Sequence, residues 1–157
     1  MGAHDSDAAE VMTSLRRLVR MIRIAERDAK AGGYALSSAQ LFVLHSLASA
    51  PAASLAELAD RTLTDQSSVS TVVAKLVAKK LVKRSTSALD RRRAELGLTP
   101  AGQRIVARVP QPLQARIIAT VAAMPDKPRK ELVRALERLV DAVGAGAVAP
   151  RMFSEEA

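Results

Sequence analysis

The side chains with the clearest chemical capacity in this sequence are cationic, and they are concentrated in one short segment. Between Lys75 and Arg93 stand eight lysines and arginines and a single acid, Asp90, so the segment carries +7 across 19 residues. The whole chain of 157 residues carries +8, so the remainder is close to neutral. Charge of this density favours a polyanionic partner, because each neutralised phosphate releases condensed counterions. A solvated lysine- and arginine-rich face is the alternative interpretation.

A run of short polar side chains directly precedes the basic segment: Asp65, Gln66, Ser67, Ser68, Ser70 and Thr71. Glutamine can pair bidentately with adenine, and hydroxyls contact base edges or phosphates. The basic segment has no aromatic residue, and the chain has only one tyrosine, two phenylalanines and no tryptophan. RNA, single strands and membrane surfaces are recognised largely through such rings, so they are disfavoured. The pattern predicts double-stranded DNA as the partner.

The chain lacks the residues that most catalytic and metal-binding sites require. The chain has no cysteine, which excludes disulfides, thiolate metal sites and thiol redox switches. It has no histidine and carboxylate cluster at ligand spacing, no glycine-rich phosphate loop and no nucleophile elbow. We therefore expect a protein that is not an enzyme and holds no cofactor or metal. The apolar stretches are too short for a membrane span and the N-terminus is acidic, so we expect a soluble cytoplasmic protein.

Capping residues divide the first half of the chain into four helices. Apolar residues spaced by three and four predict an amphipathic helix over about residues 7–31, ended by Gly32 and Gly33. Ser37 with Gln40, and then Ser54 with Glu57, are capping boxes that start a second helix and a short third one. Asp65 or Thr64 caps the fourth. Only three to four residues separate the third helix from the fourth, which is typical of a helix-turn-helix.

The second half of the sequence predicts a hairpin followed by helices. Residues 81–84 and 93–98 have strand character, and the polar loop over residues 85–92 gives the hairpin a basic tip. Thr99 followed by Pro100 starts a long helix towards residue 124, in which Pro110 and Pro112 predict a kink or a break. Asp126 is expected to cap a last helix closed by Gly144.

These elements predict a mainly α fold with a small β-hairpin wing. We expect an N-terminal helix over residues 1–35 and a winged helix-turn-helix lobe over residues 36–99. C-terminal helices are expected over residues 100–145, followed by a flexible tail over residues 146–157; the family resemblance described next implies that the N- and C-terminal helices are dimerisation helices.

The ordered motifs from about residue 36 to residue 102 resemble the MarR family of bacterial transcription regulators. The matching pieces are Leu58-Ala59-Asp60-Arg61, Asp65 to Ser70, Lys79 to Arg84, Asp90-Arg91-Arg92 and Leu98-Thr99-Pro100-Ala101-Gly102. Each piece is weak alone, but the ordered set is specific. The resemblance implies a symmetric dimer formed by the terminal helices, with a recognition helix in the major groove and a wing arginine in the adjacent minor groove.

The resemblance also assigns roles to residues of this chain. It implies that Arg92 is the arginine that enters the minor groove. The negative potential of a narrow minor groove attracts guanidinium groups, which supports this role. Asp90 would orient the wing by pairing with an arginine, although an Asx-turn residue at the hairpin tip is the alternative. The predicted DNA contacts of the recognition helix are Asp65, Gln66, Ser67, Ser68, Ser70, Thr71 and Lys75, and those of the wing are Lys83, Arg84, Asp90, Arg91, Arg92 and Arg93.

Three positions depart from the family pattern. Many relatives have glycine where Leu63 and Lys80 stand, so Lys80 is expected either to adopt a left-handed conformation or to end the helix differently. Thr71 stands where arginine is frequent, which predicts fewer guanine contacts.

A small-molecule effector is a further possibility. His45, Tyr34 and arginines of the first helix such as Arg16 would line a pocket between the dimerisation helices and the DNA-binding lobe. The alternative is that His45 is a plain core or interface histidine.

The sequence thus predicts a sequence-specific regulator of transcription, a repressor responsive to a ligand, which acts as a homodimer on a pseudo-palindromic operator. Two alternatives remain open. One is a winged-helix module that binds protein, and the other is a non-specific nucleoid-binding protein.

Overall fold

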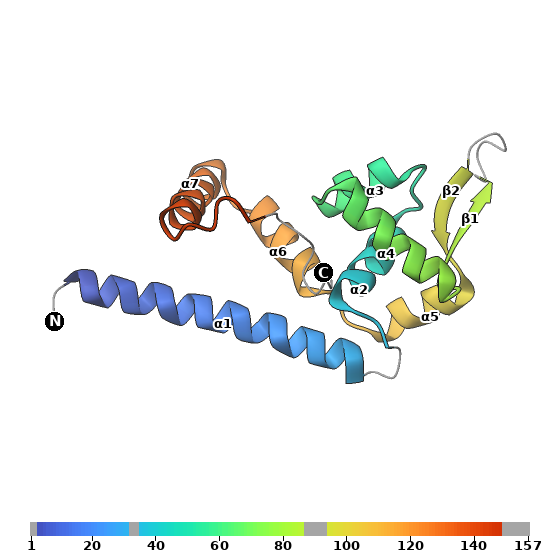
Figure 1. Cartoon of the computed structure of the whole chain (residues 1–157), viewed down its shortest axis with the longest axis horizontal. Coiled ribbons are helices and arrows are strands. Elements are labelled where there is room, and N and C mark those ends of the chain that lie inside the picture. Colours follow the sequence, from blue (N-terminus) through green and yellow to red (C-terminus); the bar gives the residue numbers. More distant parts are fainter. Residues whose placement is uncertain (1–2, 32–34, 87–93, 149–157) are drawn as a thin grey trace.

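The fold is a compact lobe from which long helices project, as seen in Figure 1. The structure is a computed structural model, and it describes residues 3–31, 35–86 and 94–148. The described elements, in chain order, are α1 (Ala3–Ala31), α2 (Ser38–Ser49), α3 (Leu55–Thr62), α4 (Gln66–Ala78), β1 (Val82–Thr86), β2 (Ala94–Leu98), α5 (Pro100–Arg108), α6 (Leu113–Ala122) and α7 (Asp126–Ala142).

The hydrophobic core belongs to the lobe, residues 36–108. Apart from Pro112, every apolar side chain described as buried lies between Leu36 and Ile105. Helix α2 runs through the middle of this core, and its side chains from Ser38 to Leu44 are all buried. Helices α3, α4 and α5 and strand β2 pack around it. An apolar helix buried on every side needs neighbours on every side, which explains why α2 organises the lobe.

The capping signals in the sequence mark the helix starts in the structure. Ser37 and Gln40 form the expected reciprocal capping box at α2. The Ser54 hydroxyl accepts from the Glu57 amide, but the Glu57 carboxylate accepts from the amide of Ala53, one residue before the expected partner. Thr99 caps α5 with Pro100 in its first turn, as predicted.

Two non-glycine residues have left-handed backbone conformations, one after each helix of the helix-turn-helix. Leu63, directly after α3, has a φ of 52°, and Lys80, just beyond α4, has a φ of 56°. Of the two alternatives that the sequence left open for Lys80, the structure has the left-handed conformation. A side chain at such a position crowds the following carbonyl oxygen, so each residue destabilises the fold.

Replacing Leu63 with glycine should stabilise the protein. The side chain is 71% exposed, so little burial is lost, and the left-handed strain disappears. After the entropic cost of glycine, we expect a gain of about 0.5–1 kcal/mol in the free energy of unfolding. Urea denaturation measures it. Leu63→Ala keeps the Cβ and should give no gain; equal stability of both variants would contradict the strain argument.

The long helix expected from residue 100 to residue 124 is broken in two. Helix α5 ends at Arg108, and α6 begins at Leu113 after a segment that contains Pro110 and Pro112. The break confirms the second of the two sequence expectations and follows from the missing backbone donors. Asp126 was wrongly expected to be a helix cap. The N-cap of α7 is Pro125, and Asp126 lies in the first turn, where it pairs with Arg129 and Lys130.

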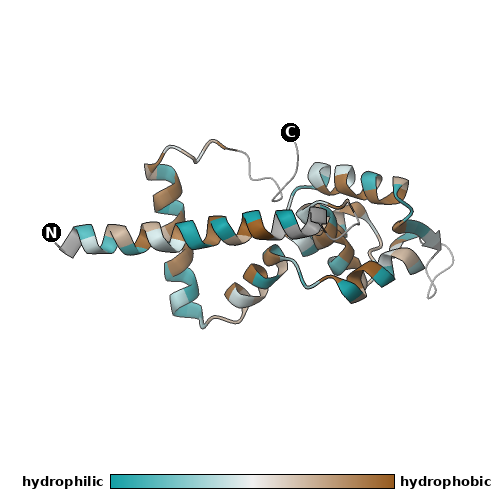
Figure 2. Ribbon diagram, turned by 90° about the horizontal axis from the view of Figure 1, so that it is seen from below, coloured by the Kyte–Doolittle hydropathy of each residue, from teal (hydrophilic) through white to brown (hydrophobic). Residues whose placement is uncertain are grey.

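Helices α1 and α7 contrast with the lobe because no described side chain on either is buried. Both carry apolar residues at helical spacing, visible as brown bands in Figure 2. Their exposed large apolar side chains are Val11, Met12, Leu18, Val19, Met21 and Ile24 on α1, and Val133, Leu136, Leu139 and Val140 on α7. Faces of this kind are typical of surfaces that a further protein chain covers.

Candidate nucleic-acid interface

The orientation of α4 is fixed by one apolar stripe. Val69, Val72, Val73 and Leu76 are all at most 3% exposed and anchor the helix in the core. The opposite face is exposed and carries Gln66, Ser67, Ser70, Thr71 and Lys75. Of the polar side chains predicted to read DNA on this helix, the structure therefore presents these five to solvent.

The first turn of α4 is organised by Asp65. Its carboxylate accepts from the Ser68 amide at 2.8 Å and from the hydroxyls of Ser67 and Ser68 at 2.5 and 2.7 Å. Ser68 is only 5% exposed. Asp65 and Ser68 thus hold the helix start in place, while Ser67 lies on the exposed side of the same turn. The expected cap at Asp65 is confirmed.

The hydrogen bonds from Ser67 and Ser68 hold the pKa of Asp65 well below its ordinary value of 3.8. A depressed pKa means that the charged form stabilises the fold, fully above the ordinary value and less as the pH falls towards the folded value. We therefore expect the stability of the wild type to fall below about pH 4 more steeply than that of Asp65→Asn, since asparagine caps without titrating. Thermal unfolding at several pH values measures this; parallel curves would contradict it.

The wing strands stand next to α4 and carry cations. Strand β1 pairs antiparallel with β2, from Val82 opposite Leu98 to Thr86 opposite Ala94. Val82 and Leu96 are buried, whereas Lys83 and Arg84 are exposed. Ala52 exchanges two backbone hydrogen bonds with Leu96, at 2.9 and 2.7 Å, and so ties the wing to the segment before α3. The predicted wing residues Asp90, Arg91, Arg92 and Arg93 lie outside the described residues.

A hollow of about 260 Å³ lies where α3, α4 and the wing meet. Its polar lining comes from the start of α3 (Ser54), the start of α4 (Gln66) and the two wing strands (Arg84 and Glu95). The structure therefore brings the recognition-helix residue Gln66 and the wing residue Arg84, which are distant in sequence, to one concave surface.

The base of the wing is fixed by a junction at the start of α5. The Thr99 hydroxyl is within hydrogen-bond distance of the carbonyl oxygens of Lys80 and Leu81, at 2.8 and 3.2 Å. The amide of Thr99 donates to the same Leu81 oxygen, and the amide of Gly102 donates to the Thr99 hydroxyl. Sequence reasoning named the Thr99-Pro100-Ala101-Gly102 motif but missed this positioning role, which depends on contacts 18 and 19 residues apart.

The turn before α3 is held by Arg61. Its guanidinium donates to the carbonyl oxygens of Ala50 and Pro51, both at 2.5 Å, and to the Glu57 carboxylate at 2.7 Å. These bonds fix the start of the helix-turn-helix against the end of α2. The only signal in the sequence was that Arg61 belongs to the Leu58-Ala59-Asp60-Arg61 motif.

Two residues of the predicted effector pocket lie in the described part of the chain, His45 on α2 and Arg16 on α1. His45 is half-buried on α2, and burial lowers its pKa, against the opposing effect of a backbone hydrogen bond to Val109. Its Nε2 atom is buried without a hydrogen-bond partner among the described residues. Arg16 is exposed, and the hollow beside it is lined by residues of α1, including Arg20 and Arg23, and not by His45. Tyr34 lies outside the described residues.

Two short helices, an exposed polar face on the second and a basic two-stranded wing together define a winged helix-turn-helix protein. A model described as the MarR family matches residues 36–93, which include α2, both helices of the helix-turn-helix and the first strand of the wing. The chain belongs to the MarR family of transcriptional regulators.

Known relatives are similar in sequence and in fold. A proposed transcriptional regulatory protein for the hcr operon of Thauera aromatica is 36% identical over 97 residues, which are 62% of this chain and 58% of that relative. The chain thus spans little more than half the length of that relative. BpsR of Bordetella bronchiseptica, whose DNA binding is regulated by 6-hydroxynicotinic acid, is 31% identical with a TM-score of 0.52, covering 83% of this chain and 93% of BpsR.

FabT of Streptococcus pneumoniae, solved in complex with DNA, has a TM-score of 0.53 and 19% identity over 88% of this chain and 96% of FabT. This similarity supports the fold alone.

In the described part of the chain, no helix is both long and apolar enough to cross a membrane.

Proposed function

We propose that this protein is a regulator of transcription that binds double-stranded DNA in a sequence-specific manner, in the cytoplasm. The observation that carries the proposal is the exposed polar face of α4, with Gln66, Ser70, Thr71 and Lys75 facing away from the core beside the cations of β1. Side chains of these types hydrogen-bond to base edges and phosphates in the major groove. Ser67 completes the face, and Asp65 and Ser68 would act by holding the helix start.

The unit that binds DNA is proposed to be a homodimer. The exposed apolar faces of α1 and α7 support this proposal, because a two-fold symmetric pair of chains would cover them. Two recognition helices related by a two-fold axis read a pseudo-palindromic operator whose half-sites lie about one helical turn, roughly 10 bp, apart. Such a dimer on a promoter would act as a repressor by occupying it.

A small anion is proposed to release the dimer from DNA. The similarity to BpsR, whose DNA binding 6-hydroxynicotinic acid regulates, supports a ligand response. The Nε2 atom of His45, buried without a hydrogen-bond partner among the residues that the structure describes, supports a ligand contact, with Arg16 and Tyr34 proposed as the other members of the site. A ligand shifts the dimer only by as much as it prefers the state that does not fit the operator. If 6-hydroxynicotinic acid weakens operator binding, His45→Ala should lose that response; an unchanged response would remove His45 from the site.

A binding titration tests the proposed function. The purified chain is titrated against duplexes from the region upstream of its own gene and against scrambled duplexes, at two salt concentrations. Selective binding with one dimer per site is the expected result. Equal binding to both duplexes that disappears with salt would instead identify a nucleoid-type protein. Absence of binding to either would favour a protein-interaction module.

Arg92→Ala should weaken operator binding about tenfold and flatten its salt dependence, if the wing inserts this side chain into the minor groove. Removing one phosphate-neutralising cation per subunit lowers the slope of log affinity against log salt by about one per subunit. Fluorescence anisotropy at four salt concentrations measures both quantities. Arg134→Ala, which removes an exposed cation from α7, is the matched control. An unchanged slope for a folded Arg92→Ala protein would exclude the wing from the interface.

A further inference from the structure

Two exposed residues of α4 already use their hydroxyl protons inside the protein. The Ser67 hydroxyl donates to Oδ1 of Asp65 at 2.5 Å, and the Thr71 hydroxyl donates to the carbonyl oxygen of Ser67 at 3.1 Å. Both side chains lie on the exposed polar face of the helix, four positions and therefore about one turn apart. A hydroxyl group has a single proton, so these two side chains have none left to donate to a bound molecule.

The direction of both hydrogen bonds follows from the chemistry of the acceptors. An ionised carboxylate and a backbone carbonyl oxygen can only accept, so the hydroxyl must be the donor in each pair. Asp65 is ionised at neutral pH, because the hydrogen bonds from Ser67 and Ser68 hold its pKa well below the ordinary value. A hydrogen bond to an ionised acceptor is stronger than one between neutral groups. Ser67 therefore keeps this bond when a weaker acceptor approaches, and it offers that acceptor only oxygen lone pairs.

Ser70 provides a comparison on the same face of α4. It is exposed, as Ser67 and Thr71 are, but no hydrogen bond within the described part of the chain involves its hydroxyl group. Ser70 can therefore donate or accept, and it can contact a phosphate oxygen as well as any base edge. A phosphate oxygen only accepts, so Ser67 and Thr71 have no proton to give it. The three hydroxyl groups of this face thus differ in what they can recognise.

We infer that Ser67 and Thr71 read exocyclic amino groups, so that each of them faces an adenine or a cytosine in the operator. In the major groove, adenine N6 and cytosine N4 are donors, whereas guanine O6 and thymine O4 are acceptors. Adenine or cytosine satisfies an oxygen that can only accept, and guanine or thymine places a second acceptor against it. The inference rests on the proposed function and narrows it to half-sites that carry such a base at two positions.

Asp65 then determines specificity without touching DNA. By accepting the proton of Ser67, its carboxylate fixes the Ser67 hydroxyl as an acceptor. Without the carboxylate, the hydroxyl could rotate its proton towards guanine O6 or thymine O4 and would tolerate either kind of base. This role differs from holding the start of α4, because the loss of a helix cap weakens binding to every sequence in the same proportion.

The first experiment tests the donated proton without DNA. The carboxyl carbon of Asp65 is followed by NMR as a function of pH. We expect Ser67→Ala to raise the pKa of Asp65 towards its ordinary value, because the charged form loses a donor, and Ser70→Ala to leave that pKa unchanged. Equal pKa values of Asp65 in the Ser67→Ala and wild-type proteins overturn the inference, whatever the protein binds.

The second experiment finds the base that faces Ser67. A preferred sequence is selected from a pool of random duplexes, and each base of its half-sites is exchanged for its transition partner, adenine with guanine and cytosine with thymine. The Ser67 base is the one at which the wild type discriminates, about tenfold as for one mismatched base pair, and Ser67→Ala does not. We expect an adenine or a cytosine there, and Thr71→Val identifies the Thr71 base in the same way. A guanine or thymine at these positions, or a uniform loss at all positions, overturns the inference.

Two variants of Asp65 separate its effect on specificity from its effect on the helix start. Asp65→Gly removes the acceptor and leaves a tolerated N-cap residue, whereas Asp65→Asn keeps an oxygen in the place of Oδ1. At the Ser67 base, we expect Asp65→Gly to lose the discrimination and Asp65→Asn to keep it. Wild-type discrimination in both variants overturns the role of Asp65. A pool that yields no preferred sequence overturns the proposed function and, with it, the reading of bases, while the NMR result still shows whether the proton is donated.

Discussion

Gly102→Ala should destabilise the lobe by about 3 kcal/mol, which is large for the addition of one methyl group. A Cβ atom built at Gly102 lies 2.3 Å from the carbonyl oxygen of Leu81, and the nearest side chain is Leu98 at 3.4 Å. The clash is with backbone that cannot rotate away, because the same oxygen accepts from the amide of Thr99. Relief requires α5 to move away from the wing. Chemical denaturation measures the loss.

Gly97→Ala is the matched control for this substitution. Gly97 lies in β2, within a few residues of Gly102, yet an added Cβ meets nothing within 4 Å. We expect its free energy of unfolding to change by less than about 0.5 kcal/mol, as for a substitution that creates no clash. If Gly102→Ala is equally neutral, the close approach of α5 to the Leu81 carbonyl is not part of the folded state.

Leu136→Glu should dissociate the proposed dimer and weaken operator binding at least 100-fold. Leu136 is 48% exposed on α7, in the apolar stripe with Val133, Val140 and Leu139. In a two-fold symmetric interface, one substitution changes both copies of the residue. Each buried apolar anchor contributes about 2 kcal/mol or more to the free energy of association. Together these exceed the 2.8 kcal/mol or so that a 100-fold change represents. Analytical ultracentrifugation gives the mass of the unit, and anisotropy gives its operator affinity.

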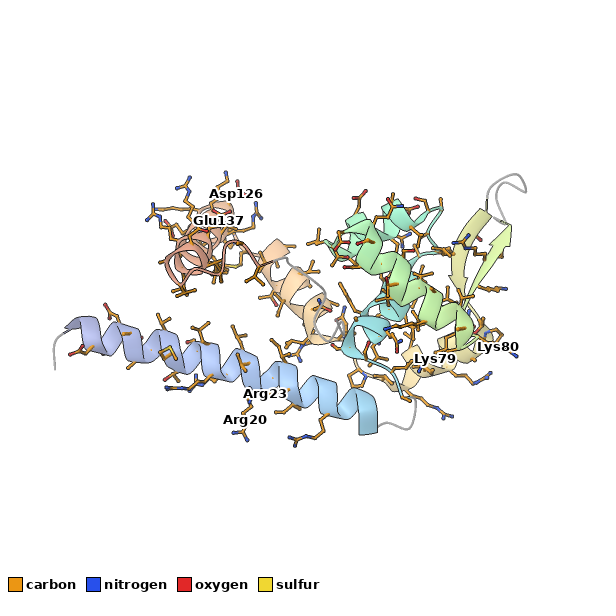
Figure 3. All side chains as sticks on the ribbon, in the orientation of Figure 1. Arg20, Arg23, Lys79, Lys80, Asp126 and Glu137 are labelled. Atoms are coloured by element: carbon orange, nitrogen blue, oxygen red, sulfur yellow. The ribbon has the colours of Figure 1, made fainter. Side chains whose placement is uncertain are left out.

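Glu137→Gln controls for changes to α7 that leave its apolar face intact. Glu137, labelled in Figure 3, follows Leu136 directly and lies outside the stripe. Its variant should remain a dimer with wild-type affinity. A Leu136→Glu protein that is folded and still dimeric would place the interface elsewhere. A monomeric variant with full operator affinity would contradict the requirement for a dimer.

The helix-turn-helix is the part of the fold that sequence reasoning predicted best. The starts of its helices are specified by side chains within four residues, such as Ser54 with Glu57 and Asp65 with Ser68, and such local contacts can be predicted from sequence. The same reasoning misassigned Asp126, because a Pro125 before it fills the cap position and leaves the acid to pair with Arg129. A pattern gives the residue types that favour a cap but not the choice between two neighbours.

The candidate site was less predictable than the fold. The sequence indicated a polar face for α4, yet it could not separate Ser68, which is 5% exposed, from the exposed Ser67 and Ser70. That distinction depends on how α4 is rotated about its own axis, which decides the face that packs against the core. The contacts of Thr99 with Lys80 and of Lys79 with Ala35 could not be predicted from the sequence either. They join residues 19 and 44 positions apart, and such contacts produce no periodic pattern in the sequence.

The unequal distribution of buried side chains has a consequence for the order of folding. The core between Leu36 and Ile105 can form within one chain, whereas the apolar faces of α1 and α7 gain burial only when another surface meets them. Collapse of the lobe is then a first-order process, independent of protein concentration. If the chain forms the proposed dimer, ordering of the two outer helices is second-order and accelerates as chains become more abundant. The yield of competent protein would therefore respond to the rate of synthesis, so a cell that makes more of this chain also assembles a larger fraction of it.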